Sequence, residues 1–156
     1  MNNYFPGTLP WVINMKGSKD ILSSVIQTAQ MGQIGIRSVL NAPLRASLKD
    51  ALRSQLREYD SIEREGLELA SARGWNLKEL NPAVKHMSNM MTKAKLSYGD
   101  PSSKTAAMMI QGNTKGIIKG YKNLNQFAVP DERIVSLSRK LLDCEKENIQ
   151  QMQGFL

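Results

Sequence analysis

The feature that most constrains the fold is a long amphipathic segment, Leu44 to Gly74, whose start and end are both marked. Its apolar and small positions recur with alternating spacings of four and three residues, and arginines and glutamates fill the positions between them. This period puts one stripe on a single side of an α-helix. The segment therefore predicts a helix that packs in a bundle. The stripe consists of Leu48, Leu52, Gln55, Tyr59, Ile62, Gly66 and Leu69.

Three further segments carry the same helical period. Ser18 offers an N-cap oxygen for a first helix, which ends at residues 41–43 because proline disfavours the helical conformation in the residue before it. A third helix is predicted from about Lys104 to Gln126, and a fourth from residues 129–131 nearly to the end. Their stripes are Leu22, Val25, Ala29, Gly32, Ile36 and Val39; Ala106, Ile110, Asn113, Ile117, Gly120 and Leu124; and Ile134, Leu137, Leu141, Cys144, Asn148 and Met152.

The connections between these helices predict the topology. Short links join the first helix to the second and the third to the fourth, so each pair should be antiparallel neighbours. The middle connection, Trp75 to Ser103, is too long for a turn and includes an expected short helix, Pro82 to Leu96. The sequence thus predicts an all-α, ferritin-like four-helix bundle with one crossover. Residues 18–156 form its single domain, and residues 1–17 form an extended arm that covers the bundle's own groove or docks on a second subunit.

Glycines inside two predicted helices indicate close helix contacts. Gly32 and Gly35 lie within the first helix, while Gly112, Gly116 and Gly120 recur every fourth residue in the third. An interior glycine costs a helix roughly 1 kcal/mol relative to alanine. We therefore expect these positions to let a neighbouring helix approach closely.

Several classes of site and location are disfavoured by composition. The only cysteine, Cys144, has no partner for an internal disulfide, and with the only histidine, His86, it cannot build a metal cluster. The first residues do not resemble a signal peptide, and no apolar run approaches the ~18 residues of a spanning helix. We expect a cytoplasmic protein without a transmembrane segment.

Residues 19–75 carry a family resemblance. They combine an Asp20-Ile21-Leu22 opening, a glutamine-rich first helix, a short turn into Leu44-Arg45, mixed carboxylates and amides from Gln55 to Glu65, and an ending through Gly74-Trp75. This third of the chain resembles the spore coat F domain family and its ferritin-like relatives. The resemblance implies a ferritin-like bundle and an association with the spore coat.

Ferritin-like relatives with a di-iron centre use one carboxylate from each of two helices and a Glu-x-x-His pair from each of the other two. Amides and hydroxyls replace most of these carboxylates here, and neither pair contains histidine, so tight iron or manganese binding is not expected. The resemblance thus implies a member without a cofactor. A degenerate metal site is the alternative. The paired positions are held by Glu58 with Ser61 and by Glu145 with Asn148, and the single positions by Gln30 and Asn113.

Most of the net charge of +7 lies between Lys78 and Lys122, a segment that contains eight lysines and only two acidic residues. A nucleic-acid surface usually adds arginines and stacking aromatics, but only Tyr98 and Tyr121 are near, so a lysine-driven nucleic-acid binder is the third hypothesis. The predicted interaction surface consists of Lys93, Lys95, Lys115, Lys119 and Lys122.

No group of residues predicts a reaction. The glutamates between Glu58 and Glu68 alternate with arginines, which is typical of solvated helix pairs, and Cys144 lies on a core stripe. The leading hypothesis is a non-enzymatic structural or interaction protein without catalytic residues. Its partner would be another protein or a second copy, and a homodimer is compatible with the apolar arm.

Overall fold

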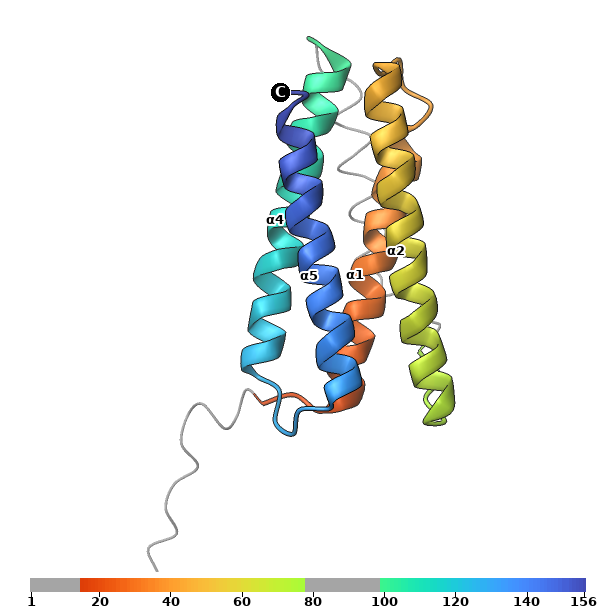
Figure 1. Ribbon diagram of the computed structural model, residues 1–156, viewed down its shortest axis with the longest axis vertical. Helices are drawn as coiled ribbons and strands as arrows, with labels where there is room; N and C mark the ends of the chain where they lie inside the picture. The colour runs from red at the N-terminus through yellow and green to blue at the C-terminus, as the bar shows by residue number, and fades with distance from the viewer. Residues whose placement is uncertain (1–14, 78–98) are drawn as a thin grey trace, which may run out of the picture.

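The structure is a computed structural model that describes residues 15–77 and 99–156. Within these ranges it contains four helices and no strand: α1 (Ser18–Val39), α2 (Ala46–Ala72), α4 (Pro101–Asn125) and α5 (Glu132–Gln153), packed as a bundle (Figure 1). The predicted all-α class is confirmed. Most of the N-terminal arm and the predicted helix Pro82 to Leu96, with His86, Lys93 and Lys95, lie outside the described residues.

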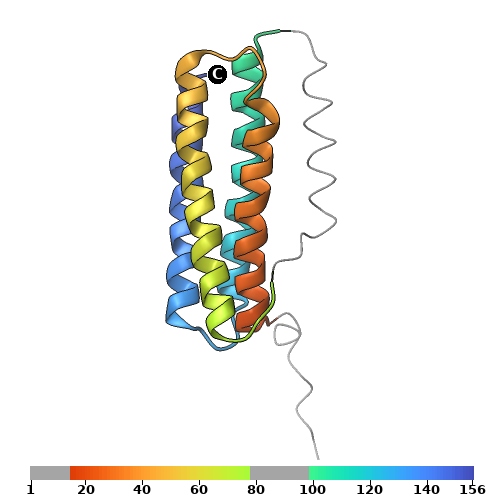
Figure 2. The same cartoon turned by 90° about the vertical axis from the view of Figure 1, so that its right-hand side faces the viewer.

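Two ion pairs at the ends of α2 define the direction of the helices. Arg45, before α2, pairs with Asp100 at the start of α4 at 2.7 Å, and Arg73, after α2, pairs with Asp131 at the start of α5. Therefore α2 runs parallel to α4 and antiparallel to α5. The connection between α2 and α4 joins opposite ends of the bundle, as a crossover requires (Figure 2).

The same aspartates begin the last two helices. The Asp100 side chain accepts a hydrogen bond from the Ser102 amide at 3.1 Å, and Pro101 occupies the first turn of α4, where its missing N–H has no helical partner to lose. Asp131 accepts from the amides of Arg133 and Ile134 at 3.0 and 3.3 Å. These caps fix where α4 and α5 start.

The first two helices differ slightly from prediction at their ends. The N-cap of α1 is Gly17 and no side chain caps the helix, so the predicted Ser18 cap is wrong, because Ser18 is already the first helical residue. Gly74 has φ +69°, and the Trp75 amide donates to the Ala70 carbonyl at 2.8 Å. Glycine adopts this left-handed conformation without a Cβ penalty, which confirms the predicted end of α2.

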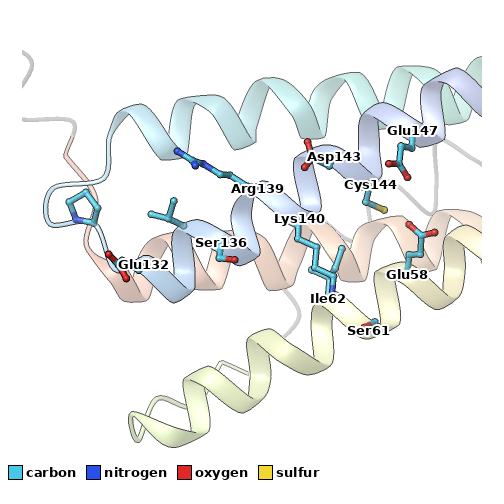
Figure 3. A pocket seen from close by; sticks show the side chains of 12 residues that line it. Glu58, Ser61, Ile62, Glu132, Ser136, Arg139, Lys140, Asp143, Cys144 and Glu147 are labelled. Atoms are coloured by element: carbon cyan, nitrogen blue, oxygen red, sulfur yellow. The ribbon is translucent and has the colours of Figure 1, made fainter.

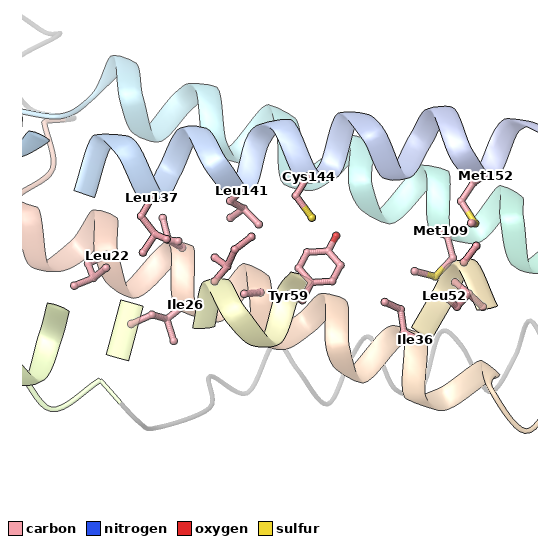
Figure 4. Packing of buried hydrophobic residues seen from close by; sticks show 14 of the residues in the cluster. Leu22, Ile26, Ile36, Leu52, Tyr59, Met109, Leu137, Leu141, Cys144 and Met152 are labelled. Atoms are coloured by element: carbon pink, nitrogen blue, oxygen red, sulfur yellow. The ribbon is translucent and has the colours of Figure 1, made fainter. Parts of the chain in front are cut away.

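The predicted stripes match the core best in α1, α2 and α5 (Figure 4). All six predicted positions of α5 are buried, as are six of the seven in α2, with Leu69 half-buried. The α4 stripe is confirmed only in part, since Ala106 and Asn113 are buried and its other four members are half-buried. Glu145 and Leu142 of α5 pack against Gly116 and Gly120 of α4, and the buried residues of α4 differ from the predicted stripe. These are Ser102, Thr105, Ala106, Met109, Asn113 and Asn123.

Three of the glycines singled out from the sequence admit a side chain from a neighbouring helix, and Gly66 of α2 likewise admits Ile26. A Cβ on Gly32 would lie 2.5 Å from the Tyr59 ring, and one on Gly120 would lie 2.6 Å from a methyl group of Leu142. A Cβ on Gly116 would overlap the Glu145 carboxylate, whereas one on Gly112 would meet nothing within 4 Å. The predicted close approach is confirmed at Gly32, Gly116 and Gly120.

None of the described helices is long and apolar enough to cross a lipid bilayer.

One short backbone contact ties the end of the arm to the loop between α4 and α5. The Lys16 amide donates to the Gln126 carbonyl at 2.6 Å, and the Ala128 amide donates to the Lys16 carbonyl at 3.0 Å. These two bonds attach the start of α1 to the α4–α5 pair of helices.

Candidate functional site

Three polar side chains from different helices meet in the middle of the core. Tyr59 of α2 donates its hydroxyl hydrogen to Oδ1 of Asn113 on α4 at 2.7 Å. Asn148 of α5 donates to the same oxygen at 3.2 Å and to the Tyr59 oxygen at 3.3 Å. Asn113 in turn donates to the Met109 carbonyl at 2.7 Å. We call Tyr59, Asn113 and Asn148 the central network, and all three residues are neutral.

The position of Tyr59 depends on a small neighbour. Its ring packs against Gly32 of α1, where any larger residue would collide with it, and only 2% of the residue is exposed. Burial raises the pKa of Tyr59 well above its ordinary value, and the nearby Glu145 adds to the effect. The hydroxyl therefore stays protonated and acts as a hydrogen-bond donor.

Glu145 is a buried carboxyl group beside the central network. Only 2% of the residue is exposed, and it lies where Gly116 leaves room on α4. Its Oε2 has no hydrogen-bond partner. Burial raises the pKa of Glu145 to about 8, although the charge of Lys119 opposes that shift. At neutral pH the group is therefore mostly protonated and uncharged.

Two glutamines near the network are also incompletely bonded. Gln55 donates to Gln151 at 2.7 Å, but its own Oε1 is buried without a partner. Gln30 is buried on α1, and its Oε1 likewise lacks a partner. Among the described residues, no hydrogen bond joins Gln30 to Asn113 or Glu145.

Glu58 lies in a different environment, in an open groove between α2 and α5 (Figure 3). The groove has a volume of about 940 Å³, and Ser61, the predicted partner of Glu58, lines it as well. Cys144 forms part of the floor. Burial first, and then hydrogen bonding to Glu58, raises the pKa of the Cys144 thiol far above its ordinary range. The thiol is therefore not a reactive thiolate.

The chemistry of the four degenerate ligand candidates does not fit a metal centre of the ferritin-like kind. Within residues 15–77 and 99–156, no three His, Cys, Asp or Glu side chains gather closely enough to hold an ion. Asn113 Oδ1 already accepts two hydrogen bonds, and of the four candidates only Glu58 and Glu145 carry a carboxyl group. A divalent cation would find too few anionic ligands to offset its charge, so the donor set does not fit a di-iron or di-manganese site.

The described part of the lysine surface lies on α4. Lys115, Lys119 and Lys122 are exposed, and the whole of α4 contains no acidic residue. Partial burial of its stem, followed by repulsion from Lys16, lowers the pKa of Lys119. Lys119 therefore lies close enough to Lys16 for their charges to interact. The predicted interaction surface stays a prediction.

Sequence reasoning placed every member of the central network on a helical stripe but missed that they bond to one another. It also assigned Glu145 only as a degenerate ligand, without its burial. The signal was present, because Tyr59, Asn113 and Asn148 are polar residues at core positions of three helices. Buried polar groups need partners, so polar residues on several stripes at one level predict a network.

The comparisons with known proteins support the fold alone. No family model matches the chain, and no curated protein sequence is significantly similar to it. A solved structure, the crystal structure of a DUF305 fragment from Deinococcus radiodurans, superimposes with a TM-score of 0.71 at 12% sequence identity. The superposition covers 96% of this chain and 97% of the DUF305 fragment. The helical bundle is therefore a known fold, while the resemblance to spore coat F domains stays a prediction.

Proposed function

We propose that this chain is a non-enzymatic structural or interaction protein whose work is done by its surface. The observation that carries the proposal is the central network. Tyr59, Asn113 and Asn148 satisfy one another at the level where the ferritin-like resemblance would assign metal ligands. Neutral groups that bond to one another leave little capacity to bind a cation or to transfer a proton.

The network has a structural use that needs no chemistry. The hydrogen bonds that join its three helices form only when α2, α4 and α5 are in the correct register. In any other register these buried polar groups would lack partners, at a cost of about 1–3 kcal/mol each. The network therefore favours one alignment of the helices over slipped alternatives. A rigid bundle of this kind suits a protein that presents fixed surfaces to partners.

One observation supports a second candidate, a metal-binding protein with a degenerate site. Oε2 of Glu145 is buried and unpartnered, so a cation that displaced the proton of this carboxyl group would find one free oxygen. Mass spectrometry for metals on protein purified without chelator separates the two candidates. We expect iron and manganese far below one equivalent, with the same content in the Glu58→Gln/Glu145→Gln double variant. Stoichiometric metal that this variant loses would overturn the proposal. Glutamine keeps the side-chain shape, so this variant should fold.

The proposed biological setting is the spore coat, after synthesis in the cytoplasm, and its support is the resemblance of residues 19–75. Immunodetection in purified spore coats and in vegetative cells of the source organism tests this setting. We expect enrichment in the coat fraction. Detection at equal levels in cells that never form spores would remove the setting and leave the interaction role standing.

A further inference from the structure

The outer face of α4 combines positive charge with exposed apolar surface. Ile118 and Tyr121 are 51% and 45% exposed, although both are large hydrophobic residues. Lys146 of α5 places its amine 5.2 Å from the centre of the Tyr121 ring. Helical geometry puts Lys115 and Lys122, three residues before and four residues after Ile118, on the same side of α4 as Ile118. The lysine patch is defined as Lys115, Lys122 and Lys146 with Ile118 and Tyr121.

The groove between α2 and α5 has the opposite character. Its floor includes Ile62, Val135 and Cys144, which are apolar, and its volume of about 940 Å³ leaves room for several side chains. Four acidic residues line it, against two basic ones, and one of these, Lys140, is already paired with Glu65. We call this the acidic groove, and its acidic members are Glu58, Glu132, Asp143 and Glu147.

We propose that the lysine patch of one copy docks into the acidic groove of a second copy. The inference rests on the proposed function and names its partner as a second copy of this chain. Ile118 and Tyr121 would leave water for the apolar floor, and the surrounding lysines would meet the carboxylates of the rim. Complementary charge of this kind selects the partner and its orientation.

The charge distribution favours a second copy over a nucleic acid or an anionic membrane. Either of those polyanions would satisfy the lysine patch, but the acidic groove on the same molecule would repel them. A second copy satisfies both surfaces at once. The centre of the patch lies on α4 and the groove lies between α2 and α5 (Figure 1). The two surfaces meet on α5, where Lys146 of the patch pairs with Asp143 of the groove at 3.9 Å. The contact is therefore heterologous, and it builds a ring or an open chain of copies.

The test is sedimentation of the full chain over a range of concentrations at about 0.05 M and about 1 M salt. We expect the average mass to rise steadily with concentration at low salt, without a plateau at two copies, and to fall to the monomer at high salt. A monomer under all conditions, or a plateau at a symmetric dimer, would overturn the inference. So would a monomer whose lysine patch binds RNA or vesicles of anionic lipid.

Charge reversal identifies the two surfaces. Lys115→Glu/Lys122→Glu reverses the patch, and Glu58→Lys/Glu147→Lys reverses part of the groove. Each variant alone should associate at least about tenfold more weakly, because reversing a complementary pair costs about 1.4 kcal/mol or more. An equimolar mixture should associate again, since the native groove of the first variant meets the native patch of the second.

Lys19→Glu/Lys49→Glu is the matched control, because it changes the net charge equally but lies on α1 and α2. It should associate like the unmodified chain, and a loss equal to that of the patch variant would contradict the docking model. Failure of the mixture to associate would do the same. Metal analysis of the same samples separates the two proposals. A metal-free monomer defeats only the docking inference, whereas stoichiometric metal defeats the proposed function in any association state.

Discussion

The ends of the core and its centre are built from different chemistry (Figure 4). On one side of Tyr59 the core is mainly apolar, through residues such as Ile26 and Leu137, and on the other side through residues such as Leu52 and Met152. Each end also has a polar pair, the buried Asn123 with Ser24 and the partly buried Gln55 with Gln151. Between them lie the central network and the uncharged Glu145. Apolar layers gain stability from burial and tolerate small shifts, whereas the centre is satisfied in one register only. The comparison suggests that the end layers supply stability and the centre supplies alignment.

The largest effect should come from the apolar layers. Leu52 is fully buried and Leu141 is 4% exposed, so alanine at either position should lower the free energy of unfolding by about 2–5 kcal/mol. Leu156, which is 62% exposed, is the matched control and should tolerate alanine with little change. Chemical denaturation checks this. An unchanged midpoint for both core variants would show that the end layers do not supply the stability.

The second effect concerns Glu145 and pH. Because its pKa is raised to about 8 in the folded chain, from an ordinary value of 4.5, the folded state holds a proton that the unfolded state releases between these values. Its contribution to stability is complete below the ordinary value and is lost as pH rises through about 8. We expect unmodified protein to lose a few kcal/mol over this window relative to Glu145→Gln. Denaturation curves at several pH values measure the difference, and parallel curves would contradict it.

The third effect tests the network itself. Tyr59→Phe removes the hydroxyl that donates to Asn113 and accepts from Asn148, which should cost about 1–3 kcal/mol. A double-mutant cycle with Asn113→Ala should give a combined loss smaller than the sum of the two single losses. Additive losses would mean that these side chains stabilise the bundle independently, and the centre would then resemble the end layers.

The smallest effect compares two glycines of the same helix. Alanine at Gly112 meets open space, so it should stabilise the chain by up to about 1 kcal/mol through helix propensity. Alanine at Gly116 would displace the Glu145 carboxyl group and should destabilise by about 1–3 kcal/mol. Thermal melting of the two variants provides the comparison. Stabilisation by both would show that Glu145 relocates without cost.

The fold was largely predictable because its determinants are local and periodic. The alternating spacing in α2, the caps and the positive-φ Gly74 each depend on residues a few positions apart. The stripe of α4 was predicted only in part, because its buried positions depend on another helix. Gly116 and Gly120 have no side chains to pack, so the contacts that Glu145 and Leu142 of α5 make with them determine which side of α4 is covered.

The site was less predictable for the same reason. Residue types on the stripes identified Asn113 and Asn148 as core amides, but their hydrogen bonds depend on the relative height of three helices. The apolar pattern of one helix also could not show that Glu58 and Glu145 differ in burial, since each is a glutamate beside a predicted stripe. Packing places the first in an open groove and the second against Gly116, and this difference in burial determines their charge.

The most direct test of an uncharged centre is the titration of the Glu145 carboxyl carbon, followed by ¹³C NMR and assigned with Glu145→Gln. Burial of this group predicts a midpoint near 8, far above the ordinary value of 4.5. That result would show that the carboxyl group beside the central network is uncharged at physiological pH. A midpoint at or below the ordinary value would mean that the core holds an ionised carboxylate with a positive partner, and the account of the centre as a neutral alignment device would be wrong.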